Sequence, residues 1–320
     1  MPVLLLALER SRLPEGSEEK IRNAAPEYEV AITREREAIA RIKDDIEIVF
    51  GFPPRELLVD MPRLAWFQQW AAGADWLRRH PDLADADFTL TSAVGIHAVQ
   101  IGEHVFACLL ALARELPGAV RAQRDRRWHG FNTVGTFELF DKRLLIVGVG
   151  AIGARLAELG NAFGMHVVGV RRHPDRGVAN VERMVGPEAL DAELAGADAV
   201  VLTVPFTDET RNLLDAERIG RMKAGAVLVN IGRGGTLDES ALAAALADGK
   251  LRGAALDVFE TEPLPADSPL WGVPNLLITA HYAGATPRYD ERAMALALDN
   301  LARYRAGRPL RNVVDKRLGY

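Results

Sequence analysis

Residues 142–164 read KRLLIVGVGAIGARLAELGNAFG and carry the clearest indication of the fold. An apolar run leads into Gly148, Gly150 and Gly153, and a helical pattern follows at once. This order predicts a strand, a tight turn and a helix. Gly148 would allow the turn, Gly150 would leave room for a phosphate against the backbone, and Gly153 would let the helix pack closely on the strand. Since the open N–H groups of such a helix attract phosphates, the stretch predicts dinucleotide binding.

A chance turn, in which Gly153 serves only helix packing, is the alternative interpretation of these glycines. The residues after them are spaced for a helix with one apolar face, at Ile152, Leu156, Leu159 and Phe163. Because a strand pattern precedes the glycines and a helix pattern follows them, dinucleotide binding is the preferred hypothesis.

Length and composition indicate an ordinary globular protein. The 320 residues suffice for about two domains, and 48% of them are apolar and 26% charged. A formal charge of -5 gives no reason to expect a nucleic-acid partner. The single cysteine, Cys108, excludes an internal disulfide, fits a cytoplasmic location and is expected to be a buried, inert thiol. The N-terminal run VLLLAL is too short for a membrane span and is predicted to be a strand. No metal site is predicted.

Strand-like and helix-like segments alternate along the whole chain, which predicts an α/β protein with parallel sheets. Before the glycine turn, strands are expected at 3–8, 28–33, 46–52, 64–68 and 88–91, and helices at 14–25 and 39–43. After it, strands are expected at 166–170, 199–204, 226–231, 254–259 and 276–279, and helices at 187–194, 216–222, 238–247 and 287–305. The second series predicts a doubly wound sheet, a Rossmann domain.

A long helix with a buried face is predicted over 95–116, close to the expected domain boundary. It contains or adjoins His97 and His104, either of which could be catalytic, although hydrogen-bonded structural histidines are preferred. The basic stretch at 121–133, RAQRDRRWHGFNT, is predicted to be a solvated loop that helps a partner subunit to dock.

The second predicted strand after the glycines ends in VVGVRRHP. A carboxylate commonly binds the ribose hydroxyls of NAD at this place, but here Arg171 and Arg172 occupy it. Arginines pair with a 2′-phosphate, so NADP(H) is predicted as the preferred cofactor, with NAD(H) possible. The alternatives are a solvated basic turn and a ribose contact from Asp175.

Three further stretches each follow a predicted strand, and so belong at the sheet edge where ligands bind. NIGRGGTLDE at 230–239 supplies Arg233, LDVFETEPL at 256–264 supplies Glu262, and ITAHYAGATP at 278–287 supplies His281. Each residue alone has an ordinary structural explanation. Together, after successive strands of a dinucleotide fold, they form a specific set.

With these motifs, the sequence resembles the D-isomer-specific 2-hydroxyacid dehydrogenase family over nearly its whole length. LAWFQQWAAGADWL (64–77) and TSAVGIHAVQIGEHV (91–105) resemble the family's substrate-domain and interdomain motifs, and VLTVPFTDETRNLL (201–214) resembles a cofactor-domain signature. The resemblance implies a Rossmann cofactor domain at 96–284 and a smaller, flavodoxin-like substrate domain at 1–95 and 285–320. Within the family, the paired arginines are similar to those of NADPH-preferring glyoxylate and hydroxypyruvate reductases.

The resemblance also implies the roles of single residues. The catalytic residues would be Arg233, Glu262 and His281, and the substrate would bind at Val94, Gly95, Arg233 and His281. The nicotinamide amide would lie near Asp257. The cofactor would contact Gly148, Gly150, Ala151, Ile152, Gly153, Arg171, Arg172, Val204, Pro205, Thr210, Ile231, Gly232, Arg233, Asp257, His281 and Ala283.

The implied activity is the reduction of a small 2-oxo acid, similar to glyoxylate or hydroxypyruvate, to the D-2-hydroxy acid by hydride transfer from NAD(P)H. Arg233 would hold the carboxylate and polarise the carbonyl, His281 would donate the proton, and Glu262 would orient the imidazole. A dinucleotide-sensing corepressor-like module with little turnover is the alternative. A formate-type dehydrogenase would have Gln where this chain has Glu262.

The substrate's side chain stays open, because Trp66, Phe67, Trp70 and Trp76 could line a pocket but more often pack in a core. The apolar helix and the Trp128 loop resemble the family's dimer contact, so a homodimer is expected.

Overall fold

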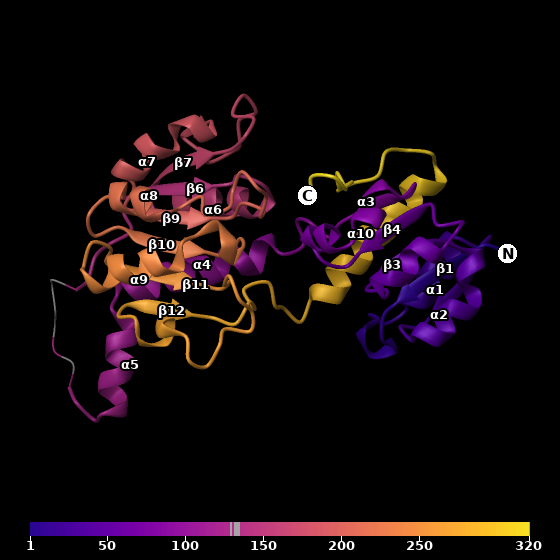
Figure 1. Cartoon of the computed structure of the whole chain (residues 1–320), viewed down its shortest axis with the longest axis horizontal. Helices are drawn as coiled ribbons and strands as arrows, with labels where there is room; N and C mark the ends of the chain where they lie inside the picture. Colours follow the sequence, from indigo (N-terminus) through magenta and orange to yellow (C-terminus); the bar gives the residue numbers. More distant parts are fainter. Residues whose placement is uncertain (129, 131–134, 320) are drawn as a thin grey trace. The chain divides into compact units, whose positions relative to one another are not determined.

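The computed structural model describes residues 1–128, 130 and 135–319. They form two compact units, the first made of Met1–Ile96 and Thr286–Tyr320 and the second of His97–Ala285. Each unit has its own parallel sheet (Figure 1). No helix in the described part of the chain has the length and apolar character needed to cross a bilayer.

The first unit is built on five parallel strands in the order β2–β1–β3–β4–β5. This is the strand order of flavodoxin-like folds, so the predicted class of the smaller domain is confirmed. The strands are β1 (Val3–Ala7), β2 (Glu29–Ile32), β3 (Ile46–Gly51), β4 (Trp66–Gln69) and β5 (Thr89–Thr91).

Helices cover both faces of this sheet, because alternate residues of β1 point to opposite sides. Leu4 and Leu6 pack with α1 (Ser17–Ala24) and α10 (Tyr289–Arg305). Leu5 and Ala7 pack on the other face, where α2 (Arg36–Ile42) and α3 (Pro81–Asp85) lie. The predicted helix at 287–305 therefore returns to the N-terminal sheet.

The aromatic residues around β4 belong to these cores. Trp66 and Trp70 are fully buried on the α10 side, and Phe67 is fully buried on the opposite face. Trp76 is partly buried and donates from its indole nitrogen to Gln69 Oε1 at 2.8 Å. The expected core role of most of these side chains is confirmed.

The second unit has seven parallel strands in the order β12–β11–β10–β9–β6–β7–β8, the doubly wound sheet that the sequence predicts. They are β6 (Arg143–Val147), β7 (His166–Val170), β8 (Arg183–Val185), β9 (Ala199–Leu202), β10 (Val227–Asn230), β11 (Gly253–Leu256) and β12 (Leu276–Ile278). Only β8 lacks a predicted counterpart, since three residues at a sheet edge leave no clear alternation.

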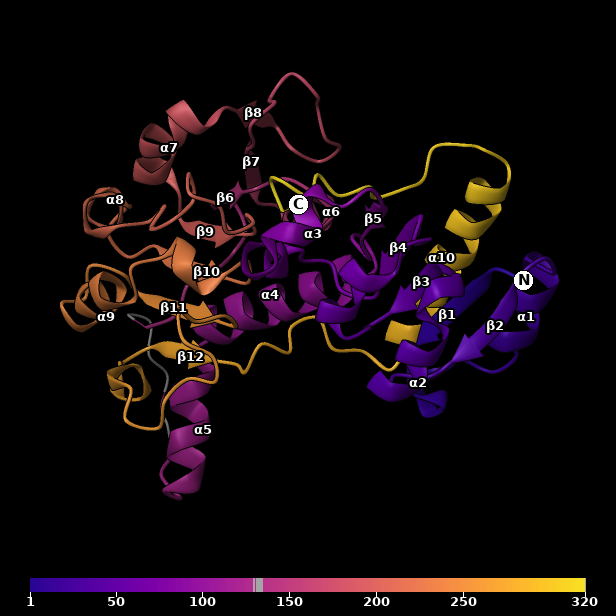
Figure 2. The same ribbon diagram turned by 45° about the vertical axis from the view of Figure 1, so that its right-hand side comes forward.

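Helices again form a layer on each face (Figure 2). Leu144 and Ile146 of β6 pack with α4 (Ala98–Ala113) and α6 (Ala151–Ala162). Leu145 and Val147 face the other layer, which is formed by α7 (Leu190–Gly196), α8 (Ala216–Arg221) and α9 (Glu239–Ala247).

The long helix predicted over 95–116 is confirmed as α4, with shorter bounds, and a second helix that the sequence did not predict follows it. α4 ends at Ala113, Glu115 takes a left-handed backbone with φ of 55°, and α5 (Leu116–Arg124) then begins with Pro117 in its first turn. Proline cannot continue a helix, which explains the break. Residues 121–124, predicted to be loop, belong to α5, and residues 129 and 131–133 of that stretch lie outside the described residues.

A buried amide on α10 joins this helix to the first sheet. Asn300 is fully buried, and its Nδ2 donates to Gln68 Oε1 at 2.9 Å and to the carbonyl of Arg311 at 3.1 Å. Its Oδ1 accepts from the Arg311 amide at 2.8 Å. Gln68 Oε1 also accepts from the hydroxyl of Thr91 at 2.8 Å. The C-terminal segment and two strands therefore share one network.

We predict that Asn300→Ala lowers the free energy of unfolding by about 2–4 kcal/mol, because the buried groups of Gln68 and Arg311 lose their partners. Chemical denaturation measures this change. Asp299→Ala is the matched control, since Asp299 forms only partly exposed ion pairs with Arg303 and Arg311 and should cost less than about 1 kcal/mol. Equal losses in the two variants would contradict the prediction.

Candidate active site

The carboxyl ends of β10, β11 and β12 lie level at one edge of the second sheet. Asn230 is the register partner of Leu256, and Leu256 is the partner of Ile278. Segments 231–236, 257–262 and 279–283 therefore leave the sheet beside one another. Such an edge is where open α/β sheets bind their ligands.

The glycine turn after β6 has the geometry that its sequence predicts. Gly148 has a φ of 101°, and a Cβ on it would lie 2.9 Å from the amide nitrogen of Val204. A Cβ on Gly153 would lie 2.8 Å from the carbonyl oxygen of Gly148, whereas nothing lies within 4 Å of a Cβ on Gly150. α6 begins directly after Gly150. The space over Gly150 and the first turn of α6 fit the pyrophosphate of a dinucleotide.

The segment after β9 is fastened to this turn by a residue that the sequence analysis missed. The hydroxyl of Thr203 donates to the carbonyls of Val147, at 3.2 Å, and Gly148. The hydroxyl of Thr210, a predicted cofactor contact, donates to the carbonyl of Pro205 at 2.7 Å. Thr210 therefore shapes its own loop, and a cofactor contact from its hydroxyl stays a prediction.

A buried asparagine fixes the turn that carries Arg233. Asn230 Nδ2 donates to the carbonyl of Arg233 at 3.1 Å, and its Oδ1 accepts from the amide of Gly232 at 3.0 Å. The hydroxyl of Thr236 donates to the same Arg233 carbonyl at 2.6 Å. Arg233 Nη1 donates to the carbonyl of Gly232 at 2.8 Å. The backbone beneath the guanidinium is thus held from two sides.

Gly234 brings the Arg233 turn against the loop that carries Glu262. A Cβ on Gly234 would lie 1.9 Å from the carbonyl carbon of Phe259, so no other residue fits without moving the backbone. Glu239 Oε1 accepts from the amide of Glu260 at 2.7 Å, and burial raises the pKa of the Glu239 carboxyl. The sequence predicted neither contact, because both depend on which strands are neighbours.

The structure brings together Glu262 and His281. Glu262 Oε2 lies 2.7 Å from His281 Nδ1, and Glu262 Oε1 accepts from the amide of Phe259 at 2.9 Å. An ionised carboxylate only accepts hydrogen bonds, so Nδ1 carries a proton and Nε2 is left for other chemistry. The side chain of His281 is 51% exposed, and its φ is 51°, an uncommon value for a residue with a side chain.

Asp257 organises the segment around His281. Its carboxylate is buried and accepts from the amides of Tyr282 and Ala283, both at 3.0 Å, and from the hydroxyl of Thr279 at 2.6 Å. Its carbonyl accepts from the amide of His281 at 2.9 Å. The carboxylate thus has a structural task, and the nicotinamide contact implied for it stays a prediction.

The two predicted 2′-phosphate ligands follow β7. Arg171 Nη1 donates to the carbonyl of Arg176 at 3.5 Å, and Arg172 forms an ion pair with Glu209. A phosphate bound by Arg172 would compete with this carboxylate.

The predicted substrate turn belongs to the first unit. Gly95 has a φ of 99°, which only glycine adopts without strain. Asn312 Nδ2 donates to the carbonyls of Ser92, at 3.2 Å, and Val94, at 2.8 Å. The polypeptide thus fixes the turn, and its contact with a substrate carboxylate stays a prediction.

Cys108 has the inert character that was expected. Its side chain is buried in α4, and burial, with the charge of Asp257, raises the pKa of the thiol to about 11. A thiol with so high a pKa is a poor nucleophile at neutral pH.

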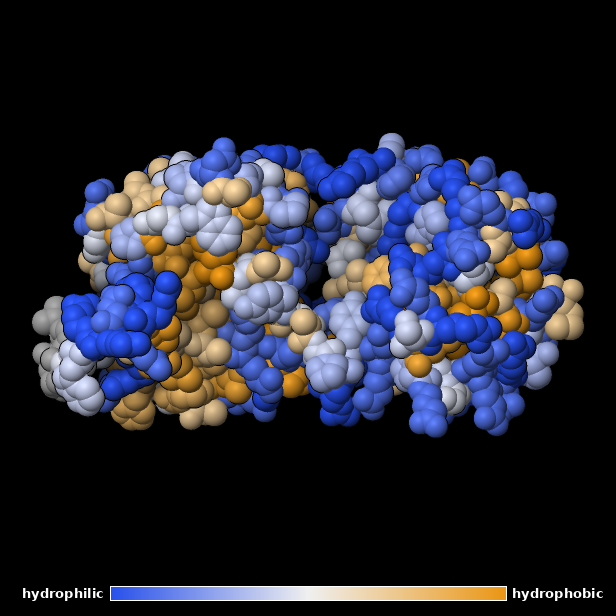
Figure 3. Space-filling model, turned by 90° about the horizontal axis from the view of Figure 1, so that it is seen from below, coloured by the Kyte–Doolittle hydropathy of each residue, from blue (hydrophilic) through white to orange (hydrophobic). Residues whose placement is uncertain are grey.

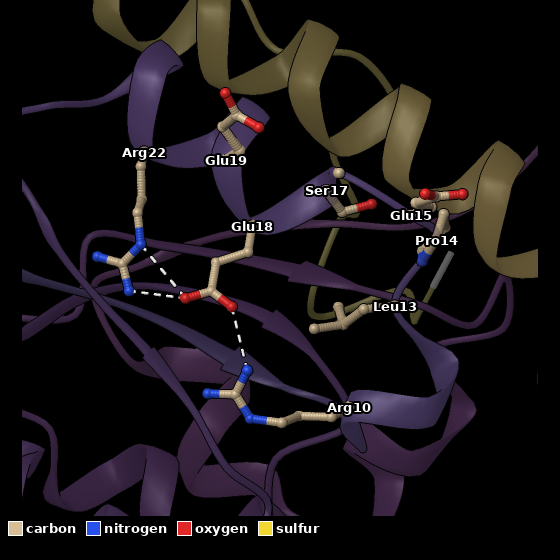
Figure 4. A pocket seen from close by; sticks show the side chains of 9 residues that line it. Arg10, Leu13, Pro14, Glu15, Ser17, Glu18, Glu19 and Arg22 are labelled. Atoms are coloured by element: carbon tan, nitrogen blue, oxygen red, sulfur yellow. Dashed lines mark hydrogen bonds and ion pairs between the residues drawn. The ribbon is translucent and has the colours of Figure 1, made fainter.

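A separate hollow of about 500 Å³ lies on the first unit, beside the start of α1 (Figure 4). Glu18 accepts there from Arg10 at 3.1 Å and from Arg22 at 2.8 Å. These hydrogen bonds lower the pKa of Glu18. Since the two arginines share one carboxylate, this hollow does not resemble a catalytic site.

The chain is similar in sequence to proteins of known family. Residues 106–283 match the family model described as "D-isomer specific 2-hydroxyacid dehydrogenase, NAD binding domain". A glyoxylate reductase from Aeropyrum pernix is 34% identical over 306 residues, which cover 91% of this chain and 87% of the relative. The chain belongs to the D-isomer-specific 2-hydroxyacid dehydrogenase family. The protein is therefore a dehydrogenase of this family, and its cofactor is a nicotinamide dinucleotide.

Solved structures of family members cover the whole length. A 2-hydroxyacid dehydrogenase from Xanthobacter autotrophicus, in complex with NADPH and MES, is 32% identical with a TM-score of 0.84 over 100% of this chain and 99% of that one. An NADPH-dependent glyoxylate/hydroxypyruvate reductase from Sinorhizobium meliloti, in complex with NADP and sulfate, is 28% identical with a TM-score of 0.84 and the same coverage. The two-domain α/β fold is thus that of the family.

We predict that Gly234→Ala lowers the turnover of a 2-oxo acid with NAD(P)H about 100-fold, because the added methyl group displaces the Phe259 backbone and with it Glu262. Steady-state kinetics measure the loss. Gly220→Ala is the control, since Gly220 is exposed in α8 and a Cβ there meets nothing within 4 Å. Wild-type turnover in Gly234→Ala would show that this approach does not position Glu262.

Proposed function

We propose that this protein uses NADPH to reduce a small 2-oxo acid, similar to glyoxylate or hydroxypyruvate, to the D-2-hydroxy acid. The hydrogen bond of 2.7 Å between Glu262 Oε2 and His281 Nδ1 carries the proposal. It leaves Nε2 as the proton-donating atom of an imidazole that has an anionic partner. Relatives described as glyoxylate reductases support the choice of substrate class.

The chemistry assigns one task to each side chain. When NADPH is bound, its nicotinamide would supply the hydride that the carbonyl carbon accepts. Arg233 holds the substrate carboxylate and polarises the carbonyl, where negative charge builds up. His281 donates the proton from Nε2 to the carbonyl oxygen, and Glu262 keeps the ring oriented through its hydrogen bond to Nδ1. Gly148, Gly150 and the first turn of α6 would hold the pyrophosphate.

The corepressor-like binding module is disfavoured as the function. A module that only senses a dinucleotide has no need of a carboxylate that orients an imidazole, yet here the Phe259 amide holds Glu262 Oε1 while Oε2 contacts His281 Nδ1. A formate-type reaction is disfavoured because residue 262 is Glu. We propose that the domain formed by residues 1–95 and 285–320 binds the substrate and that the domain formed by residues 96–284 binds the cofactor.

We predict that His281→Asn lowers kcat for glyoxylate reduction by about 100-fold or more, while the affinity for NADPH changes little. Asparagine tolerates the left-handed backbone of residue 281, so the variant removes the imidazole without straining the loop. Stopped-flow or steady-state kinetics give kcat, and quenching of protein fluorescence gives NADPH affinity. Wild-type turnover in this variant would remove His281 from the mechanism.

The preference for NADPH is a separate prediction. We expect a lower KM for NADPH than for NADH, and expect the double variant Arg171→Ala/Arg172→Ala to raise the KM for NADPH about 10- to 100-fold with little effect on NADH. Arg176→Ala, an exposed arginine in the same loop, serves as the control. A clear preference of the unaltered enzyme for NADH would contradict the assignment.

We further propose that the enzyme is a homodimer that pairs through α5 and Trp128. α5 projects from the second unit in Figures 1 and 2, with Leu116 50% and Val120 57% exposed, and Trp128 is 94% exposed. Figure 3 shows orange, apolar residues on this face of the second unit, beside a mainly blue, hydrophilic projection at its end. Covering such side chains with a second copy removes apolar surface from water.

Light scattering after size exclusion tests the pairing. We expect a mass of twice the 35.0 kDa of one chain, and expect Val120→Asp to shift it towards one chain because a charge would enter the interface. Val59→Asp, at an exposed apolar residue of the first unit, should not change the mass. A single-chain mass for the unaltered protein would refute the dimer.

A further inference from the structure

His104 and Thr279 form a contact that the proposed reaction does not use. His104 lies on α4, and Thr279 directly follows β12. His104 Nε2 is 3.2 Å from the hydroxyl oxygen of Thr279, and the His104 ring meets the ring of Tyr282 edge-on, with centroids 5.8 Å apart. The apolar face of α4 packs against the sheet, and this packing fixes the position of the helix that carries His104. It is a hydrogen-bonded helix histidine, as the sequence analysis preferred.

The direction of these hydrogen bonds follows from the groups themselves. The Asp257 carboxylate only accepts, so the hydroxyl of Thr279 donates its hydrogen to Asp257 Oδ1, 2.6 Å away. The same hydroxyl oxygen must then accept from His104, which places a hydrogen on His104 Nε2. A chain of donors thus runs from α4 through Thr279 to the buried carboxylate.

Asp257 in turn forms hydrogen bonds with the backbone of the segment that contains His281. Its two carboxylate oxygens accept from the amides of Tyr282 and Ala283, both at 3.0 Å, and its carbonyl accepts from the amide of His281 at 2.9 Å. The segment needs such support because His281 has a φ of 51° and a half-exposed side chain. Left-handed backbone at a residue with a side chain persists only where its surroundings enforce it.

We propose that His104 and Thr279 are positioning residues that orient the Asp257 carboxylate. They thereby maintain the hydrogen bond between the His281 ring and Glu262. Neither residue is assigned a contact with substrate or cofactor. The inference rests on the proposed function for its effect on turnover, but its effect on the 279–283 segment does not depend on that function.

Two pairs of variants test the proposal in the full-length protein. Thr279→Val removes the hydroxyl at nearly constant volume, and Thr279→Ser restores it. His104→Leu removes the donor, and His104→Gln places an amide N–H₂ near the position of Nε2. We expect Thr279→Val and His104→Leu to lower kcat for glyoxylate about 10- to 100-fold, as for other residues that orient a functional histidine. The KM for glyoxylate should stay within about threefold, because Arg233 still binds the carboxylate.

Hydrogen exchange measured by mass spectrometry supplies a readout that needs no turnover. In Thr279→Val and His104→Leu, the peptide that covers 279–283 should exchange faster, while peptides from β6 and α6 should keep their rates. Thr279→Ser and His104→Gln should recover most of both kcat and protection. A uniform rise in exchange, unchanged protection of 279–283, or failure of these conservative variants to recover would overturn the proposal. If the unaltered protein reduces no 2-oxo acid, the proposed function fails, and the exchange rates still decide the inference.

Discussion

The register of three parallel strands is the constraint on which the site depends. Asn230, Leu256 and Ile278 are side by side in β10, β11 and β12, so the segments after them start at the same height. Only this alignment lets Glu262 on one segment reach His281 on the next at 2.7 Å. A shift of one residue in either pairing would turn the side chains to the opposite face of the sheet.

Buried polar side chains fix the conformation of the loops at this edge of the sheet. Asn230 and Asp257 are almost fully buried, and each holds the backbone of a loop through several hydrogen bonds. Gln68 and Asn300 do the same in the first unit, where they join α10 to β4. Satisfied polar networks of this kind select one arrangement among many that would bury the same apolar surface. Both units therefore combine apolar sheet faces with a few polar residues that define the loops.

The site also contains backbone that is costly to form. His281 has a left-handed conformation, and Gly234 touches the backbone of Phe259 so closely that a methyl group would not fit. Such features persist where neighbouring contacts enforce them, and they concentrate at functional sites. Here both features support the contact between the Glu262 carboxylate and the His281 imidazole, which come from different loops.

Local sequence patterns were enough to predict the two α/β units, the glycine turn and the residue types at the sheet edge, because strand and helix periods and glycine spacing are local properties. The sequence predicted β6, α6 and the positions of Arg233, Glu262 and His281 along the chain. It missed α5, which begins after a left-handed residue, Glu115, and has a proline in its first turn.

Which of these residues come into contact depends on how the chain folds in three dimensions. The contact of Gly234 with Phe259, the support of Glu260 by Glu239, and the chain from His104 to Asp257 all join segments that are distant in sequence. No local pattern encodes them, because they depend on the order and register of the strands.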